Sequence, residues 1–373
     1  MKNAIVIGSG IAGASVAYEL AKKGVDVTII DRNEIGQATQ ASAGIISPWA
    51  AQRRNKDWYE LVRLGAKAYP AFMQELAEFR VQPSAYKKVG SIHLFDKQER
   101  LEAAIERVKK RRVDAPEIGK LTSLSSTDVE EVLPFVQKNT FQGLLIEGGA
   151  RVDGRALQQT LLEAASTLGA RNIQGDARLL IEKDCIQGVQ LKDQTLFTDA
   201  VVVATGAWMD DVFNPYDITF DVRPQKAQLI HLQLPTIDTS NLPVIMPPNN
   251  QYMLPSEDHR MIIGATHETD AGFDTRVTAG GMNEVLSKAL TIAPGLSTST
   301  VLEARVGLRP FCGNSLPVFG QIKQITGLYG VNGLGASGLT MGPFIGKQLA
   351  KQITGEELDI DLAPYAFDRI LLQ

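Results

Sequence analysis

The N-terminal segment, residues 4–31, places the tightest constraint on how this chain can fold. Residues 4–7 form an apolar run without polar interruption, as expected of a buried parallel strand. A G-x-G-x-x-G motif follows over residues 8–13, and residues 14–23 then carry apolar side chains at helical spacing. A second apolar run ends in the acidic Asp31. A strand, a glycine-rich turn, a helix, a strand and an acid in this order indicate a dinucleotide-binding βαβ unit.

Each part of this unit has a mechanical role. Gly8 lets the strand turn sharply, Gly10 lets the backbone approach a pyrophosphate, and Gly13 lets the helix pack closely on the strand. The N-terminus of the helix offers unpaired N–H groups to the phosphates, and Asp31 is placed to accept hydrogen bonds from ribose hydroxyls. The alternative is a tight strand–helix turn that uses glycine only for packing. The motif does not distinguish FAD from NAD.

Composition narrows the class of protein. The 373 residues are too many for one compact core and suggest two domains. A net charge of −4 gives no electrostatic basis for binding nucleic acid. The basic run at residues 109–112 is expected at the solvated C-terminal end of a helix. The two cysteines, Cys185 and Cys312, and the four histidines show no metal-ligand spacing, so we expect neither a catalytic metal nor a disulfide framework.

We also expect a cytoplasmic protein without a membrane segment. Ile5 already lies in the first predicted strand, which leaves no room for a signal peptide before it. No apolar run reaches the roughly 18 residues that a membrane-spanning helix needs.

An uncharged segment of small residues follows the βαβ unit. Residues 37–48 are mostly small and lead into two isoleucines. The hydroxyl of Ser42 and nearby N–H groups could meet a phosphate, and Ala43 and Gly44 could let a flat ring lie against the backbone. The alternative is a flexible connection, but a run of this kind is better suited to close approach of a ligand.

The rest of the chain predicts alternating helices and strands. Helices are expected over residues 57–79, 97–112, 154–169 and 280–292, and in a last helix that ends at residue 353. Strands are expected over residues 90–95, 144–149, 221–234, 251–255, 260–266 and 300–308, with several shorter ones between 170 and 203. Glycine-rich strand-to-helix turns thus occur at the start, in the middle and at the end of the chain. They predict one cofactor domain assembled from three separated segments.

Four motifs carry a wider resemblance. They are Val-Ile-Gly-Ser-Gly-Ile-Ala-Gly at residues 6–13, Ala-Ser-Ala-Gly at 41–44, Val-Ala-Thr-Gly-Ala-Trp at 203–208, and Gly-Leu-Arg-Pro-Phe-Cys-Gly-Asn-Ser-Leu-Pro-Val-Phe-Gly at 307–320. Together they resemble the D-amino acid oxidase family of FAD enzymes, specifically its glycine oxidase and D-amino acid dehydrogenase branch. The resemblance covers nearly the whole chain.

The family fold implies an α/β protein, α+β overall, with a Rossmann-like FAD-binding domain and a second domain on a mixed antiparallel sheet. We expect the FAD-binding domain to comprise residues 1–85, 143–220 and 306–373, and the substrate domain residues 86–142 and 221–305.

The resemblance also implies which residues contact FAD. The matching positions are Gly8, Gly10, Ile11, Ala12, Gly13, Asp31 and Arg32 at the adenosine and pyrophosphate, Ser42, Ala43, Gly44 and Ile45 at the phosphate and flavin, Arg178 at the adenine through its backbone, Ala204, Thr205 and Gly206 over the cofactor, and Gly333, Gly335, Ala336, Ser337, Gly338, Leu339 and Thr340 at the pyrimidine end of the flavin.

The resemblance implies two residues at the substrate, and a third, His267, departs from the family pattern near it. Arg309 matches the residue that clamps the substrate carboxylate, which a planar guanidinium can hold with two hydrogen bonds. Tyr252 matches a tyrosine whose hydroxyl shares that carboxylate. The alternatives are an ion pair for Arg309, a role better suited to Arg305, and a core position for Tyr252. His267 falls where glycine oxidase has an apolar residue, so it could accept a proton, contact a polar side chain of the substrate, or point away.

Other positions depart from the family pattern. Ala336 stands where glycine oxidase carries a basic residue beside the flavin, which weakens the case for glycine itself as the substrate. Trp49, Arg53 and Arg54 could line the entrance or belong to an exposed loop. Cys312 does not align with the cysteine that binds flavin covalently in related sarcosine oxidases, so we expect dissociable FAD.

The resemblance implies oxidation of the amine of an amino acid to an imine by hydride transfer to flavin N5. The substrate could be a D-amino acid, glycine, sarcosine or a cyclic imino acid, and oxygen or another acceptor would take the electrons. No side-chain base is needed if the amine arrives neutral. The alternatives are an NAD-dependent dehydrogenase and a non-catalytic flavoprotein subunit. The substrate, the acceptor and whether the chain forms a homo-oligomer stay open.

Overall fold

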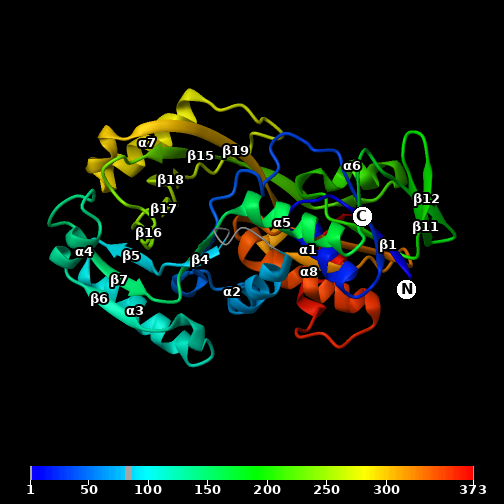
Figure 1. The fold of residues 1–373 in the computed structure, drawn as a ribbon, viewed down its shortest axis with the longest axis horizontal. Coiled ribbons are helices and arrows are strands. Elements are labelled where there is room, and N and C mark those ends of the chain that lie inside the picture. Colours follow the sequence, from blue (N-terminus) through cyan, green and yellow to red (C-terminus); the bar gives the residue numbers. More distant parts are fainter. Residues whose placement is uncertain (1, 80–85, 373) are drawn as a thin grey trace.

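The apolar N-terminal run forms strand β1 (Asn3–Ile7) inside a six-stranded sheet of the computed structural model, which describes residues 2–79 and 86–372 (Figure 1). The order of the strands is β20 (Val318–Gln321), β21 (Leu328–Asn332), β13 (Val201–Val203), β1, β2 (Asp26–Asp31) and β9 (Arg171–Gln174). All neighbours are parallel except β20 and β21. The parallel strands follow the order typical of dinucleotide-binding sheets.

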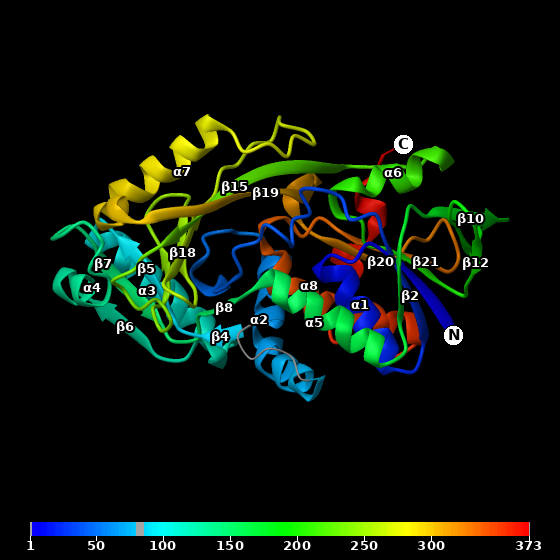
Figure 2. The same ribbon diagram turned by 45° about the horizontal axis from the view of Figure 1, so that its top comes forward.

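Four helices pack around this sheet and on one another. They are α1 (Ile11–Lys22), α2 (Lys56–Leu76), α5 (Gly154–Thr167) and α8 (Gly338–Thr354). Helices α1, α5 and α8 lie side by side next to β1 and share one apolar core (Figures 1 and 2). Helix α8 can approach α1 closely because Gly346 lacks a Cβ, which would overlap Ser15 of α1.

A second sheet forms the other half of the molecule. Its eight strands are β19 (Thr300–Cys312), β15 (Val222–Gln233), β18 (Arg260–Gly264), β17 (Tyr252–Pro255), β16 (Val244–Met246), β5 (Ser91–Phe95), β7 (Gln142–Ile146) and β6 (Leu121–Leu124). Only β16 and β5 pair in parallel. The apolar core here includes side chains of α4 (Ser126–Val132) and α7 (Ala279–Ile292), and α3 (Gln98–Arg112) packs on β5 and β7. Strands β15 and β19 are long and run from this sheet toward the first one (Figure 2).

The remaining elements form smaller sheets and one short helix. The remaining strands and helix are β3 (Ile45–Ile46), β4 (Tyr86–Lys88) and β8 (Ala150–Val152) in one small sheet, β10 (Arg178–Glu182), β11 (Cys185–Gln190) and β12 (Thr195–Phe197) in a second, the pair β14 (Thr219–Phe220) and β22 (Leu371–Leu372), and α6 (Met209–Phe213). Within the described residues, no helix is both long enough and apolar enough to cross a membrane.

The predicted elements agree with the structure to within a few residues, with one correction. The strand predicted over residues 300–308 continues to Cys312, so Arg309 lies within strand β19 rather than after it. The register places Pro310 directly opposite Pro224 of β15. The two prolines therefore interrupt a single rung of the ladder, and the strand can continue beyond them.

The division of the chain into two domains stays a proposal. It is supported by the six strands of the first sheet, which all fall inside the proposed FAD-binding segments. The proposed boundaries near residues 142 and 306 fall inside β7 and β19, because these two strands continue across them.

Candidate cofactor and substrate site

A cavity of about 500 Å³ follows the carboxyl ends of the parallel strands and extends to the second sheet. Its walls include the ends of β1, β2 and β21, the turn after β13, and residues from β15, β17 and β19. Open α/β sheets bind their ligands at this edge because the connections diverge there and leave a crevice. Residues predicted at the cofactor and residues predicted at the substrate therefore line one continuous cavity.

The glycines of the first turn have separate structural reasons. Gly8 has a φ of +98°, and a Cβ there would overlap the carbonyl oxygen of Ala204. A Cβ on Gly13 would overlap the carbonyl oxygen of Gly8, so this glycine lets α1 pack on the end of β1, as predicted. Gly13 does not line the cavity, whereas Gly8 and Gly10 do. The approach of Gly10 to a pyrophosphate stays a prediction.

The small-residue segment lies along the cavity wall. Ser42, Ala43, Gly44 and Ile45 all line it. Gly44 has a φ of +93°, and a Cβ would overlap the carbonyl oxygen of Val152, whose own N–H donates to the carbonyl of Gly44 at 2.8 Å. The hydroxyl of Ser42 donates to the carbonyl of Thr39 at 2.7 Å. The segment is thus fixed against β8 rather than being a flexible connection.

Thr39 is a site residue that the sequence did not reveal. Its hydroxyl lines the cavity and accepts a 3.0 Å hydrogen bond from the N–H of Ile11, the first residue of α1. One unpaired donor of the helix N-terminus is therefore satisfied by a side chain of the small-residue segment. The sequence offered one indication of this role, which is that Thr39 is one of several hydroxyl residues in the small-residue segment.

Asp31 and Arg32 both line the cavity but interact with the chain itself. The carboxylate of Asp31 accepts hydrogen bonds from Ser9, through its N–H and its hydroxyl, from the N–H of Asn33 and from the side chain of Gln37. Its contact with a ribose stays a prediction. Arg32 forms ion pairs with nearby acids, and the shortest is with Asp211 at 2.8 Å.

Two glycine-rich turns close the opposite wall. Ala204, Thr205 and Gly206 line the cavity after β13, and Gly335, Ala336, Ser337, Gly338, Leu339 and Thr340 line it where α8 begins. The side chain of Asn332, which the sequence did not reveal, joins the two turns. It donates to the carbonyl of Gly206 at 2.9 Å and accepts from the N–H of Gly333 at 2.7 Å.

Besides Gly13, two more predicted cofactor residues, Gly333 and Arg178, lie outside the cavity lining. Gly333 has a φ of +73°, and a Cβ there would overlap the sulfur of Cys312, so it has a packing role. Arg178 begins β10, and the lining stops one residue earlier, at Ala177. Backbone contact of Arg178 with an adenine stays a prediction.

At the second-sheet end of the cavity, the guanidinium of Arg309 has polar neighbours but no acid. Its Nη1 lies 3.3 Å from Nδ1 of His267 and 3.5 Å from Oε1 of Gln225. No carboxylate of the described residues lies within 4 Å of it. Burial lowers the pKa of Arg309, which means that the surroundings disfavour its positive charge. Arg305, by contrast, pairs with Glu303 at 2.5 Å, as the sequence suggested.

Tyr252 and His267 complete this end of the cavity. Both line it together with Arg309. Burial raises the pKa of the Tyr252 hydroxyl, and the charge of Arg309 and a hydrogen bond to it offset part of that effect. Burial and then the charge of Arg309 lower the pKa of His267, so its imidazole is neutral near pH 7. A neutral Nδ1 can accept a hydrogen bond from Arg309, and Gln225 is a neighbour that the sequence did not reveal.

Trp49, Arg53 and Arg54, which the sequence suggested for the entrance, differ in their burial and contacts. Trp49 is only 1% exposed and does not line the cavity, so neither alternative considered for it is correct. Arg53 lies over the ring of Trp58 at 4.7 Å, and Trp58 lines the cavity. Arg54 is exposed. Cys312 is buried away from the cavity lining, and burial raises the pKa of its thiol to about 12.

In the portion of the chain that the structure describes, no three His, Cys, Asp or Glu side chains are grouped as metal ligands.

The family model described as "DAO: FAD dependent oxidoreductase" matches residues 3–352. An uncharacterised oxidoreductase of Bacillus subtilis (strain 168), YurR, is 48% identical over 98% of both chains. The glycine oxidase of Pseudomonas putida (strain KT2440) is 26% identical, also over 98% of both chains. Among solved structures, the iminodiacetate oxidase of Chelativorans sp. BNC1 superimposes with a TM-score of 0.94 at 40% identity, and the match covers 97% of this chain and 98% of that one.

Proposed function

Because the chain belongs to the DAO family of FAD-dependent oxidoreductases, we propose that it oxidises the C–N bond next to the carboxylate of an amino or imino acid. The observation that carries the proposal is the guanidinium of Arg309, which lies at the cavity beside the Tyr252 hydroxyl without an acidic partner among the described residues. The family excludes the alternative of an NAD-dependent dehydrogenase.

The cavity fits FAD. Its walls are backbone at Gly8 and Gly44, where a Cβ would overlap neighbouring carbonyl groups, and a flat ring can lie against such a surface. The first turn of α8 lines the cavity, and a helix N-terminus stabilises negative charge. In the turn after β13, the hydroxyl of Thr205 is buried and has no hydrogen-bond partner in the described chain. These segments would hold FAD, which when bound supplies the two-electron oxidation.

Arg309 is suited to bind the carboxylate of the substrate. A buried cation without a counter-charge is unfavourable, and a bound carboxylate would remove that penalty while taking two hydrogen bonds from the guanidinium. Tyr252 can donate its hydroxyl proton to the same carboxylate, because its raised pKa keeps it protonated. A substrate held at its carboxylate has its α-carbon fixed in position, and positioning of this kind contributes several kcal/mol to catalysis.

His267 does not need to act as a base in this scheme. Its lowered pKa keeps the imidazole neutral, and its Nδ1 faces the guanidinium rather than a substrate proton. An amine that arrives neutral needs no side-chain base. His267 then contributes by orienting Arg309.

The similar proteins support the choice of substrate class. The names iminodiacetate oxidase and glycine oxidase both denote enzymes that act on an amine bearing a carboxylate. Ala336, where glycine oxidase carries a basic residue, favours a substrate other than glycine. We therefore rank imino acids, including iminodiacetate, and D-amino acids above glycine. Without a cysteine in the cavity lining of the described residues, we further propose that FAD is held non-covalently.

The test mixes the purified holoenzyme, without oxygen, with iminodiacetate, sarcosine, proline, glycine and D- and L-amino acids, each beside the amine that lacks its carboxylate. We expect at least one carboxylated compound to bleach the flavin absorbance and its decarboxylated partner to fail. Readmitting air separates an oxidase, which recovers its colour rapidly, from a dehydrogenase. The proposal is wrong if no compound bleaches the flavin, which would favour the non-catalytic subunit, or if both members of each pair bleach it equally.

A further inference from the structure

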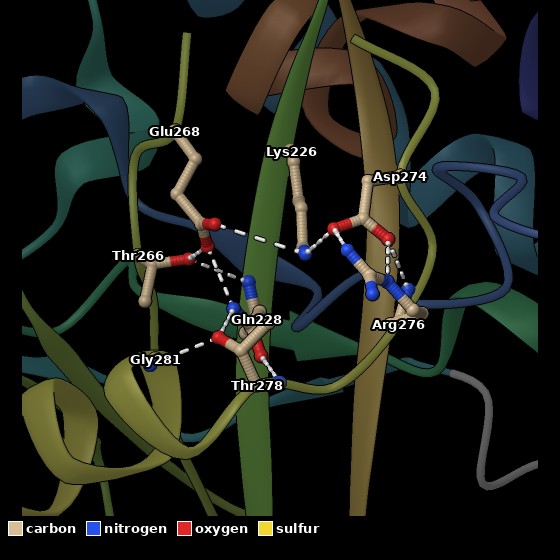
Figure 3. Close-up of polar contacts among 8 residues, drawn as sticks. All are labelled: Lys226, Gln228, Thr266, Glu268, Asp274, Arg276, Thr278 and Gly281. Atoms are coloured by element: carbon tan, nitrogen blue, oxygen red, sulfur yellow. Dashed lines mark hydrogen bonds and ion pairs between the residues drawn. The ribbon is translucent and has the colours of Figure 1, made fainter. Parts of the chain in front are cut away.

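A buried cation lies behind the substrate end of the cavity, outside the cavity lining. The side chain of Lys226, on β15, is 1% exposed, and its Nζ lies 3.0 Å from a carboxylate oxygen of Asp274 and 3.8 Å from one of Glu268 (Figure 3). Both acids belong to the segment of residues 268–278, which is the later part of the connection from β18 to α7. Lys226 is buried, whereas the side chains of Glu268 and Asp274 are 31% and 25% exposed. Desolvation of the lysine offsets much of the attraction, so these pairs are a poor way to gain stability. Its presence here calls for another explanation.

The neighbouring polar residue of β15 holds both ends of the same segment. The side-chain amide of Gln228 donates to Glu268 at 2.8 Å and to the hydroxyl of Thr278 at 2.9 Å. Its oxygen accepts from the N–H of Thr278 at 2.9 Å. The hydroxyl of Thr266 donates to Glu268 at 2.6 Å (Figure 3). Lys226 and Gln228 therefore bind the beginning and the end of the segment to one face of β15.

Backbone pairing places His267 on the opposite face. The N–H and carbonyl groups of Lys226 and Glu268 exchange hydrogen bonds at 3.0 and 2.9 Å, and the N–H of Thr266 donates to the carbonyl of Gln228 at 3.1 Å. Successive side chains along paired strands alternate between faces. Thr266 and Glu268 thus lie with Lys226, whereas His267, between them, lies against Arg309 at 3.3 Å.

We propose that Lys226 is a positioning residue for the substrate-binding arginine. By pairing with Glu268 and Asp274, it fixes the register in which residues 266–268 meet β15, and this register directs His267 toward Arg309. A slip of one residue would turn His267 to the back face, and Arg309 would lose the neighbour that orients it. This inference rests on the proposed function only in assigning Arg309 to a carboxylate.

The experiment uses three variants of the holoenzyme. Lys226→Met removes the charge and keeps the chain length, and Lys226→Arg keeps the charge as a rescue. Arg276→Met is the matched control, because Arg276 pairs with the same Asp274 at 2.9 Å from the solvent side and its side chain is 82% exposed. The first readout is the NMR titration of His267, assigned with His267→Gln. The second is the dissociation constant of acetate, read from the flavin absorbance.

In Lys226→Met we expect the pKa of His267 to rise toward its ordinary value, because the imidazole leaves Arg309. We expect acetate to bind about tenfold more weakly or worse, as for the loss of one hydrogen bond to a charged group. Lys226→Arg should restore both quantities, and Arg276→Met should leave both near wild type. If Lys226→Met does not fold, Asp274→Asn removes the nearer partner and should shift both readouts in the same direction.

The outcomes are separable. An unchanged titration of His267 in Lys226→Met, or an equal change in Arg276→Met, would overturn the positioning role. If acetate does not bind to the wild-type enzyme, the assignment of Arg309 to a carboxylate fails. The titration of His267 still tests the register in that case, because it requires no substrate.

Discussion

Replacing Arg309 by methionine should abolish carboxylate recognition and leave the fold almost intact. Arg309 lies at the cavity with Gln225 and His267 as its polar neighbours and with no acid within 4 Å in the described chain. In the complex, its loss would leave the substrate carboxylate desolvated and unpaired. Removing one partner of a buried charge pair costs about 2–5 kcal/mol, which corresponds to roughly a 30- to 5,000-fold fall in kcat/KM.

The free energy of unfolding of the same variant should change little. Burial disfavours the charge of Arg309 in the folded protein, and a lowered pKa for a cation means that folding is penalised while it stays protonated. Its hydrogen bonds offset part of that penalty. We therefore expect the free energy of unfolding of Arg309→Met to fall by less than about 1 kcal/mol, if it falls at all.

The assay compares anaerobic flavin reduction, FAD content and urea denaturation for Arg309→Met and Arg305→Met. Arg305 lies four residues earlier on β19 but already pairs with Glu303 at 2.5 Å. Arg305→Met should keep kcat/KM within a few-fold of wild type. Unchanged reduction kinetics in Arg309→Met would refute the assignment. A stability loss of several kcal/mol in the same variant would show that Arg309 is mainly a structural residue.

Three further predictions follow from single contacts. Gly44→Ala should destabilise the protein by about 1–3 kcal/mol, because the added Cβ overlaps the carbonyl of Val152. Gly10→Ala should keep the fold and weaken FAD binding. Thermal unfolding and FAD titration of both variants check these expectations. Burial lowers the pKa of His231 to about 4, so the free energy of unfolding should decrease as the pH falls from about 6.5 to 4. His231→Gln should remove at most about 3 kcal/mol of that decrease. Urea titrations of both proteins at the two ends of this pH range measure the difference. Phe273→Ala removes an aromatic contact of 5.8 Å with Trp208 at the cavity and should speed FAD release about 2- to 10-fold, as measured by flavin fluorescence.

The parts of the site that follow local rules could be predicted from the sequence. A glycine turn after an apolar strand has few structural solutions, so the roles of Gly8 and Gly13 in turning and packing followed directly from the motif. The small-residue segment was found because uncharged small residues mark close approach. Arg309 and Tyr252 came from the family resemblance, and the structure places both on the cavity wall.

The parts that depend on tertiary register could not be predicted. Gln225 is a site residue because the antiparallel register sets it opposite Arg309, 84 positions away in the chain. Asn332 and Thr39 act by joining segments that only folding brings together. Trp49 was misjudged because an aromatic residue beside two arginines in a loop gave no indication of its complete burial.

The alternation along β15 separates two functions that share one strand. Gln225 and Ala227 belong to the cavity side, where Ala227 lines the wall and Gln225 contacts Arg309. Lys226 and Gln228 belong to the other side, where they hold the segment that follows His267. A larger side chain at Ala227 should therefore change which substrates fit without altering the alignment of Arg309. A change at Lys226 should weaken every carboxylate alike, because it acts through the register and not through the shape of the cavity.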